Sequence, residues 1–148
     1  MGNSQSTIKI NYEFVQSAIT SKNTLLINTM KSSSQECLIS TTLSIDEEEG
    51  VLNSHVGKNK TIPIIVYGIN SCDDTVDKKY KQLTGLGFQN VYLYPGGIFE
   101  WLLLQDIYGS DLFSTTETCT DPLKYKNSTS NYSTHQNIYT GNSLVLLG

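Results

Sequence analysis

Short apolar runs alternate with helical patterns from residue 8 to about residue 116, and this alternation constrains the fold more than any other feature. The segments 62–67 and 91–94 are continuous apolar runs, and each is followed by a helical pattern, over 75–86 and 98–108. Continuous runs of this kind are typical of strands that are buried on both faces, as in a parallel sheet. The pattern therefore predicts an α/β domain.

The first half of the chain follows the same pattern. We expect a helix over 12–19 and short strands over 25–28 and 37–39. Ser44 and Glu47 have the spacing of a capping box, in which each side chain accepts a hydrogen bond from the other residue's backbone amide. The sequence therefore predicts that a further helix begins directly after Ser44.

The composition limits the possible classes of function. The chain has 148 residues, a formal net charge of −4 and no arginine. An acidic balance disfavours nucleic-acid binding, and no run approaches the roughly 18 apolar residues of a membrane span. We expect a flexible leader over 1–7, one domain over 8–116, and a disordered tail over 117–148, where Ser, Thr and Asn dominate.

The three cysteines, Cys37, Cys72 and Cys119, are an odd number at wide spacing. This indicates a reducing compartment rather than a disulfide framework, with Cys37 in the core and Cys119 on the surface. No two cysteines have the close spacing of a zinc knuckle. We therefore predict a cytoplasmic protein with no metal and no cofactor.

Two motifs carry a family resemblance. The strand that ends in Val66-Tyr67 leads into a loop and a helix, and residues 87–101 read GFQNVYLYPGGIFEW. Together they resemble the C-terminal half of a rhodanese-like domain, and the resemblance extends over about 8–116. It implies a rhodanese-like α/β fold, in which helices cover both faces of a mostly parallel, five-stranded sheet. It also implies sulfurtransferase chemistry in the loop after Tyr67.

The active-site-like loop departs from the family pattern at its two main positions. In an active rhodanese, the residue directly after the Val-Tyr pair is the cysteine that carries the persulfide, and an arginine follows later in the loop. Gly68 and Asp73 stand at these positions here, and Asn28 and Met30 replace an acid and an arginine that follow an earlier strand of the family. The whole loop consists of Gly68, Ile69, Asn70, Ser71, Cys72, Asp73 and Asp74.

These departures decide the predicted function. Gly68 has no nucleophile, and Asp73 and Asp74 compete with an external anion for the amides at the start of helix 75–86. We predict a rhodanese-like module that lacks standard thiosulfate sulfurtransferase activity and binds an unidentified protein or small molecule at the loop pocket. The alternative is an active sulfurtransferase or thiol oxidoreductase that uses Cys72 as its nucleophile, activated by the nearby helix N-terminus.

The N-terminus carries a second signal. Residues 1–6 read MGNSQS, which matches the N-myristoylation pattern with Gly2 as the acceptor. Because one myristoyl chain binds membranes only marginally and Lys9 is the only basic residue nearby, we expect reversible, peripheral attachment. At the other end, the apolar segment Leu144–Leu147 is compatible both with docking onto the domain and with exposure to solvent.

Overall fold

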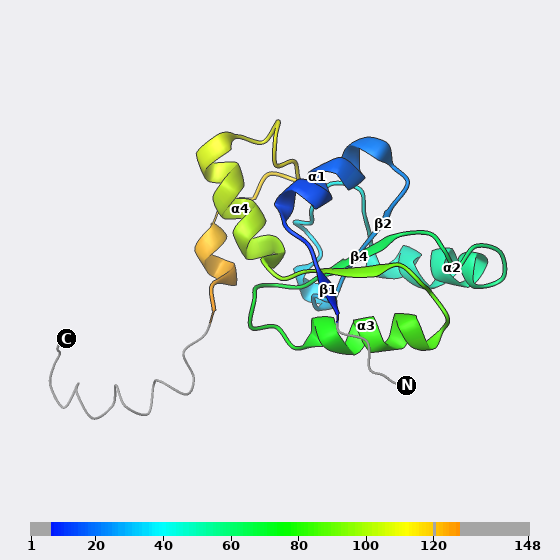
Figure 1. The fold of residues 1–148 in the computed structure, drawn as a ribbon. Coiled ribbons are helices and arrows are strands. Elements are labelled where there is room, and N and C mark those ends of the chain that lie inside the picture. The colour runs from blue at the N-terminus through cyan, green and yellow to red at the C-terminus, as the bar shows by residue number, and fades with distance from the viewer. Residues whose placement is uncertain (1–6, 120, 128–148) are drawn as a thin grey trace, which may run out of the picture.

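The computed structural model describes residues 7–119 and 121–127, and Figure 1 shows their arrangement. The five strands of these residues form one sheet in the order β1-β5-β4-β2-β3, and all neighbouring strands are parallel. The predicted α/β architecture is confirmed. In chain order, the elements are β1 (Ile8–Lys9), α1 (Tyr12–Ser21), β2 (Leu25–Asn28), η1 (Ser32–Ser34), β3 (Thr42–Leu43), α2 (Ile45–Val56), β4 (Ile64–Tyr67), α3 (Thr75–Gly85), β5 (Val91–Tyr94), α4 (Gly97–Tyr108) and η2 (Pro122–Tyr125).

The central strand β4 sends its side chains into two separate hydrophobic clusters. Ile65 and Tyr67 belong to a cluster that also holds side chains of α1 and α4, whereas Ile64 and Val66 belong to one with α2 and α3. Figure 1 shows α1 on one side of the sheet and α3 on the other. Because successive side chains of a strand point to opposite faces, a continuous apolar run satisfies both clusters.

The helix expected after Ser44 begins there with the predicted capping box. The Ser44 hydroxyl accepts from the Glu47 amide at 3.3 Å, and the Glu47 carboxylate accepts from the Ser44 amide at 3.1 Å. The strand expected over 37–39 does not form. Ile39 instead makes an isolated antiparallel bridge with Thr115, because this segment pairs with the chain that follows α4 rather than with the sheet.

The expectation of three unpaired cysteines is wrong. Cys37 and Cys119 form a disulfide with their Cα atoms 6.0 Å apart, and Cys72 is free and exposed. The two bonded cysteines are 82 residues apart in sequence, but the pairing of Ile39 with Thr115 brings their segments together. Cys37 is buried, as predicted, whereas Cys119 is half-buried. The odd number of cysteines is therefore no support for a reducing compartment.

The domain also extends past the boundary predicted at residue 116. Residues 122–125 form η2, and Tyr125 is only 5% exposed because its ring joins the cluster of α1 and α4. The sequence of this segment has little apolar content, which is why the sequence alone predicts a tail here. The remaining predicted tail over 128–148, with Leu144–Leu147, and the leader residues 1–6, with Gly2, lie outside the described residues.

Candidate functional site

The active-site-like loop leaves the carboxyl end of β4, in the middle of the sheet, and the start of α4 closes against it. The carbonyls of Gly68 and Ile69 accept hydrogen bonds from the amides of Ile98 and Phe99, at 3.0 and 2.9 Å. Gly97 makes this approach possible, since its φ is +66° and a Cβ there would lie 2.6 Å from the Gly68 carbonyl oxygen. The Gly-Gly motif thus fixes the loop onto the fold.

The loop folds around the carboxylate of Asp73. One carboxylate oxygen accepts from the Ile69 amide at 2.9 Å, and the other accepts from the Thr75 amide at 3.0 Å and from the Thr75 hydroxyl. The Thr75 hydroxyl also contacts the hydroxyl of Thr29, at the end of β2. A carboxylate that receives several donors is held by charge-assisted hydrogen bonds. The chain therefore supplies its own anion to this turn.

Gly68 leaves no space for a nucleophile. A Cβ at this position would lie 2.3 Å from a carboxylate oxygen of Asp73, 2.8 Å from the Thr29 hydroxyl and 2.8 Å from a methyl group of Val76. Real Cβ atoms do not approach other atoms so closely. The position at which the resemblance places a persulfide cysteine is thus filled by neighbouring side chains, with Asp73 closest.

The other loop residues point elsewhere. Cys72 is exposed, and its backbone amide donates to the Asn70 side-chain oxygen at 3.0 Å. The Asn70 amide nitrogen in turn donates to the Tyr125 carbonyl, at 2.9 Å. Ser71 and Asp74 are exposed, and Asp74 makes no side-chain bond to the helix although it stands at its N-cap. Of the two candidate caps, only Asp73 accepts from an amide of α3.

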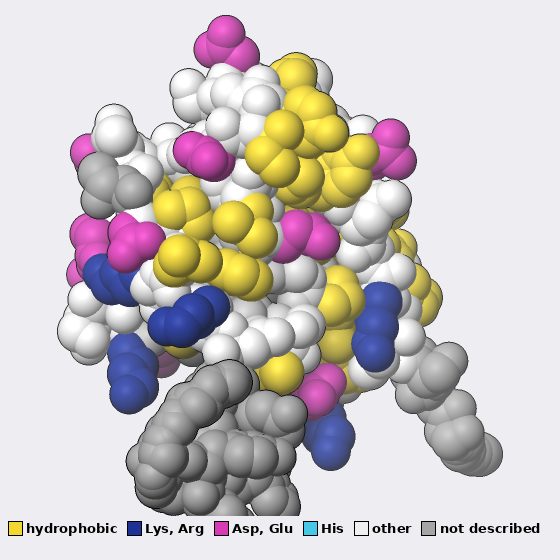
Figure 2. Space-filling model, turned by 90° about the vertical axis from the view of Figure 1, so that its left-hand side faces the viewer, with side chains coloured by type: hydrophobic (Ala, Val, Ile, Leu, Met, Phe, Trp, Pro, Cys, Tyr) yellow, Lys and Arg dark blue, Asp and Glu magenta, His cyan; other side chains and the backbone are white. Residues whose placement is uncertain are grey.

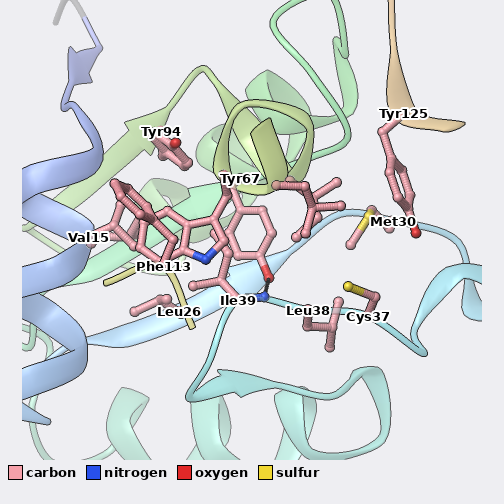
Figure 3. Close-up of a cluster of buried hydrophobic side chains, with 14 of the residues drawn as sticks. Val15, Leu26, Met30, Cys37, Leu38, Ile39, Tyr67, Tyr94, Phe113 and Tyr125 are labelled. Carbon is pink, nitrogen blue, oxygen red and sulfur yellow. Dashed lines mark hydrogen bonds between the residues drawn. The ribbon is translucent and has the colours of Figure 1, made fainter. Parts of the chain in front are cut away.

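The end of β2, next to the loop, is held by hydrogen bonds between neutral groups. Asn28 is buried, and its side-chain oxygen accepts from the Met30 amide at 3.0 Å and from the Gln35 side chain at 2.8 Å. Met30 points into the hydrophobic cluster that also contains Tyr125 (Figure 3). The two replacements at the end of β2 therefore exchange a charged pair for a neutral amide network and an apolar contact.

Two hollows border the loop. The smaller, of about 90 Å³, is lined by residues that include Asn70, Ser71 and Asp73. The larger, of about 370 Å³, lies between α2 and α3 and includes Thr29 and Thr75 in its lining. An ion pair between Lys79 and Glu48, 2.5 Å apart, borders the larger hollow. Among residues 7–119 and 121–127, no three His, Cys, Asp or Glu side chains gather as a metal site.

Tyr94, at the end of β5, also borders the site. Its hydroxyl donates to the Glu100 carboxylate of α4 at 2.5 Å. Burial raises the pKa of Tyr94 above its usual range, and the adjacent Glu100 carboxylate raises it further. The phenol therefore remains protonated at neutral pH and acts as a hydrogen-bond donor between the strand and the helix.

The sequence predicts the position of the loop but not all of the residues that hold it by hydrogen bonds. Thr75 was detectable, because an Asp followed two positions later by Thr at a helix start is a common local hydrogen-bonding pattern. Thr29 and Tyr125 were not detectable, since each meets the loop only through the tertiary fold. The Asn70–Tyr125 contact joins residues 55 positions apart.

Comparison with known proteins supports the fold assignment. No protein-family model matches the sequence, and no curated protein sequence does. Among solved structures, the BH2092 protein of Bacillus halodurans matches with a TM-score of 0.60 and 18% identity, covering 86% of this chain and 90% of that one. The Alr3790 protein of Anabaena matches with a TM-score of 0.53 and 18% identity, covering 86% and 91%.

The Anabaena protein Alr3790 indicates which fold these structures share. The Alr3790 protein contains a domain that is described as rhodanese-like. A protein from Lactobacillus plantarum matches less of this chain, with a TM-score of 0.53, 14% identity, and coverage of 66% and 84%. This chain therefore has the rhodanese-like fold, as its motifs indicated.

Proposed function

We propose that this chain is a rhodanese-like binding module without thiosulfate sulfurtransferase activity. One observation carries the proposal: the Asp73 carboxylate accepts from the Ile69 amide at 2.9 Å and from the Thr75 amide at 3.0 Å, inside the turn that would receive a sulfur anion. Gly68, at the position of the family's nucleophile, has no side chain and no space for one. The family's nucleophile is thus absent at Gly68, and the Ile69 and Thr75 amides already donate to a carboxylate of the chain.

Electrostatics supports the same conclusion. Two unit charges of the same sign that are ~6 Å apart, at an effective dielectric constant of ~20, repel by roughly 3 kcal/mol. An anion such as thiosulfate would meet this repulsion from Asp73, and the sequence has no arginine to offset it. An anionic substrate is therefore disfavoured at the loop.

The size of the hollow beside the loop favours a protein partner over a small molecule. The hollow that Asn70, Ser71 and Asp73 line has a volume of about 90 Å³, well below the roughly 300–1,000 Å³ of pockets that enclose a drug-sized ligand. The larger hollow, of about 370 Å³, lies within that range, but none of residues 68–74 lines it. The exposed residues Ser71, Cys72 and Asp74 instead present a polar loop to the surface. We infer that the module binds a partner protein through this loop edge of the sheet.

The test is the release of thiocyanate from thiosulfate and cyanide. We expect wild-type protein to produce no more thiocyanate than the Cys72→Ser variant, while an active rhodanese at the same concentration serves as the positive control. The alternative function requires the opposite result. Turnover near that of the control enzyme, lost in Cys72→Ser, would establish Cys72 as a nucleophile and overturn the proposal.

We further propose that the module is tethered to membranes through an acyl chain on Gly2. The support is the N-terminal sequence around Gly2. Burial of about ten CH₂ groups of a myristoyl chain in the membrane, at ~0.8 kcal/mol each, favours binding by roughly 8 kcal/mol before the entropic cost. In the described part of the chain, no helix is long and apolar enough to cross a membrane. The described chain begins with Thr7 in front of the edge strand β1, at one side of the sheet.

A further inference from the structure

The 3-10 helix η2 (Pro122–Tyr125) lies beside the active-site-like loop, since the Tyr125 carbonyl accepts from the Asn70 side chain. Figure 2 faces the side that carries α4 and η2, where charged side chains surround apolar ones. Tyr125 contributes its ring to the hydrophobic cluster and its carbonyl to the Asn70 side chain, so this one residue connects the core to the loop. Cys119 and residues 121–127, here called the strap, therefore have a direct contact with the candidate site.

The noncovalent anchors of the strap are the packing of η2 against α4 and a small number of polar contacts. Besides the Tyr125 contacts, Lys124 forms an ion pair with Glu36 at 3.0 Å, and both side chains are more than half exposed. Exposed pairs of this kind contribute little to stability. The Asn127 side chain makes one long contact, of 3.5 Å, with the Ser71 hydroxyl. Apart from the buried ring of Tyr125, the strap is therefore held by exposed polar contacts, and segments of this kind are among the first to open locally.

The Cys37–Cys119 disulfide restrains the strap. It fixes the start of the strap to the segment that precedes Leu38, and both cysteines line a hollow of about 120 Å³ together with Tyr125. Figure 3 shows Cys37, Leu38, Met30 and Tyr125 at one end of the cluster. Cys119 is half-buried, so a thiolate can reach one sulfur of the bond from solvent.

We propose that the Cys37–Cys119 disulfide is a reversible latch that holds η2 against the loop, and that its reduction releases η2 and frees the half-buried Asn70 side chain for a partner. The reductant is a dithiol. Its thiolate attacks the Cys119 sulfur, and Cys37 leaves as a thiolate. The second thiol of the reductant then attacks the mixed disulfide and displaces Cys119, so that two electrons and two protons pass to the protein and the dithiol becomes a disulfide.

This latch rests on the proposed function, because it regulates access to the surface assigned to binding. In a cytoplasmic location, a disulfide is more often a transient, redox-sensing bond than a permanent one. The latch therefore gives this bond a role that does not require an oxidising compartment. It also links the redox state of Cys37 and Cys119 to the position of Asn70 in the loop, through Tyr125.

Limited trypsin digestion of the full-length protein tests the latch. Trypsin cleaves after Lys124 and Lys126 in the strap, and Lys58, just after α2, is an exposed control site on the opposite face of the sheet. We expect dithiothreitol to raise the rate of cleavage after Lys124 by about tenfold or more, with little change after Lys58. Cys119→Ser should be cleaved at the fast rate without reductant, and Cys72→Ser should behave as wild type.

Two results would overturn the latch. One is a rate of cleavage after Lys124 that does not change when intact mass shows that the disulfide has been reduced. The other is an equal rise after Lys124 and Lys58, which would indicate global unfolding. Thiocyanate release, measured in the same samples, separates the two proposals. Turnover that appears only after reduction would refute the inactive-module proposal and leave the latch intact.

Discussion

The close contacts of Gly68 make a quantitative prediction about Gly68→Ala. The added methyl group would lie 2.3 Å from the Asp73 carboxylate oxygen, so this side chain must move by about an ångström and give up its bond to the Ile69 amide. The group would also lie 2.8 Å from both Thr29 and Val76. Overpacking costs about 1–3 kcal/mol, and a lost hydrogen bond to a half-exposed charge adds about 1 kcal/mol. We expect a total loss of about 2–4 kcal/mol.

Urea denaturation at neutral pH measures this loss, and Gly50→Ala is the matched control. Gly50 lies inside α2, and a Cβ added there would have no atom within 4 Å. Alanine at this position should therefore stabilise the protein by about 0.5–1 kcal/mol. The two identical substitutions should change the free energy of unfolding in opposite directions. A Gly68→Ala variant within about 0.5 kcal/mol of wild type would refute the account of the loop.

A double-mutant cycle assigns the cost to Asp73. Asp73→Ala alone removes the acceptor of the Ile69 and Thr75 amides and should cost about 1–3 kcal/mol. In the double variant with Gly68→Ala, the closest contact of the new methyl group is absent. The double variant should therefore lose about 1 kcal/mol or more less unfolding free energy than the two single variants lose together. Additive losses would mean that the carboxylate is not the group that fills the space beside Gly68.

Three further predictions concern other parts of the chain. Cys119→Ser should lower the free energy of unfolding of the oxidised protein by about 2–4 kcal/mol and have little effect in dithiothreitol, as measured in urea. Tyr67→Phe should cost about 1–3 kcal/mol, because it leaves the Ile39 amide without its buried acceptor. Burial raises the pKa of Tyr67, so the contribution of this phenol to the free energy of unfolding is fully present below about pH 10 and is lost at higher pH. Tyr67→Phe should therefore reduce the loss of unfolding free energy at alkaline pH. Gly2→Ala should move the protein from the membrane fraction of a eukaryotic host to the soluble fraction, whereas Asn3→Ala should not; a wild type that is already soluble would refute the lipid anchor.

The fold was predictable because its information is local. The apolar runs that form β4 and β5, and the capping box that begins α2 at Ser44, can each be recognised within a few residues. The strand predicted over 37–39 failed because that apolar segment pairs with Thr115, which lies far away in the sequence. An apolar run shows that a segment is buried, but it does not show which segment covers it.

The site was predictable only in part, and for the same reason. The sequence places Gly68 and Asp73 at the two altered positions, and the structure brings them into contact. The sequence does not indicate that the Asp73 carboxylate points into the loop while Cys72 points to solvent, because these directions depend on the hydrogen bonds inside the folded loop. The disulfide and the burial of Tyr125 depend on contacts of still longer range.

We propose that the loop, because it holds the Asp73 carboxylate, takes up no sulfur atom. Mass spectrometry of the intact protein after incubation with excess thiosulfate, followed by peptide mapping without reductant, tests this most directly. We expect no persulfide on any cysteine, including the exposed Cys72. A persulfide on Cys72 at near-stoichiometric yield, absent from the Cys72→Ser variant, would contradict this proposal.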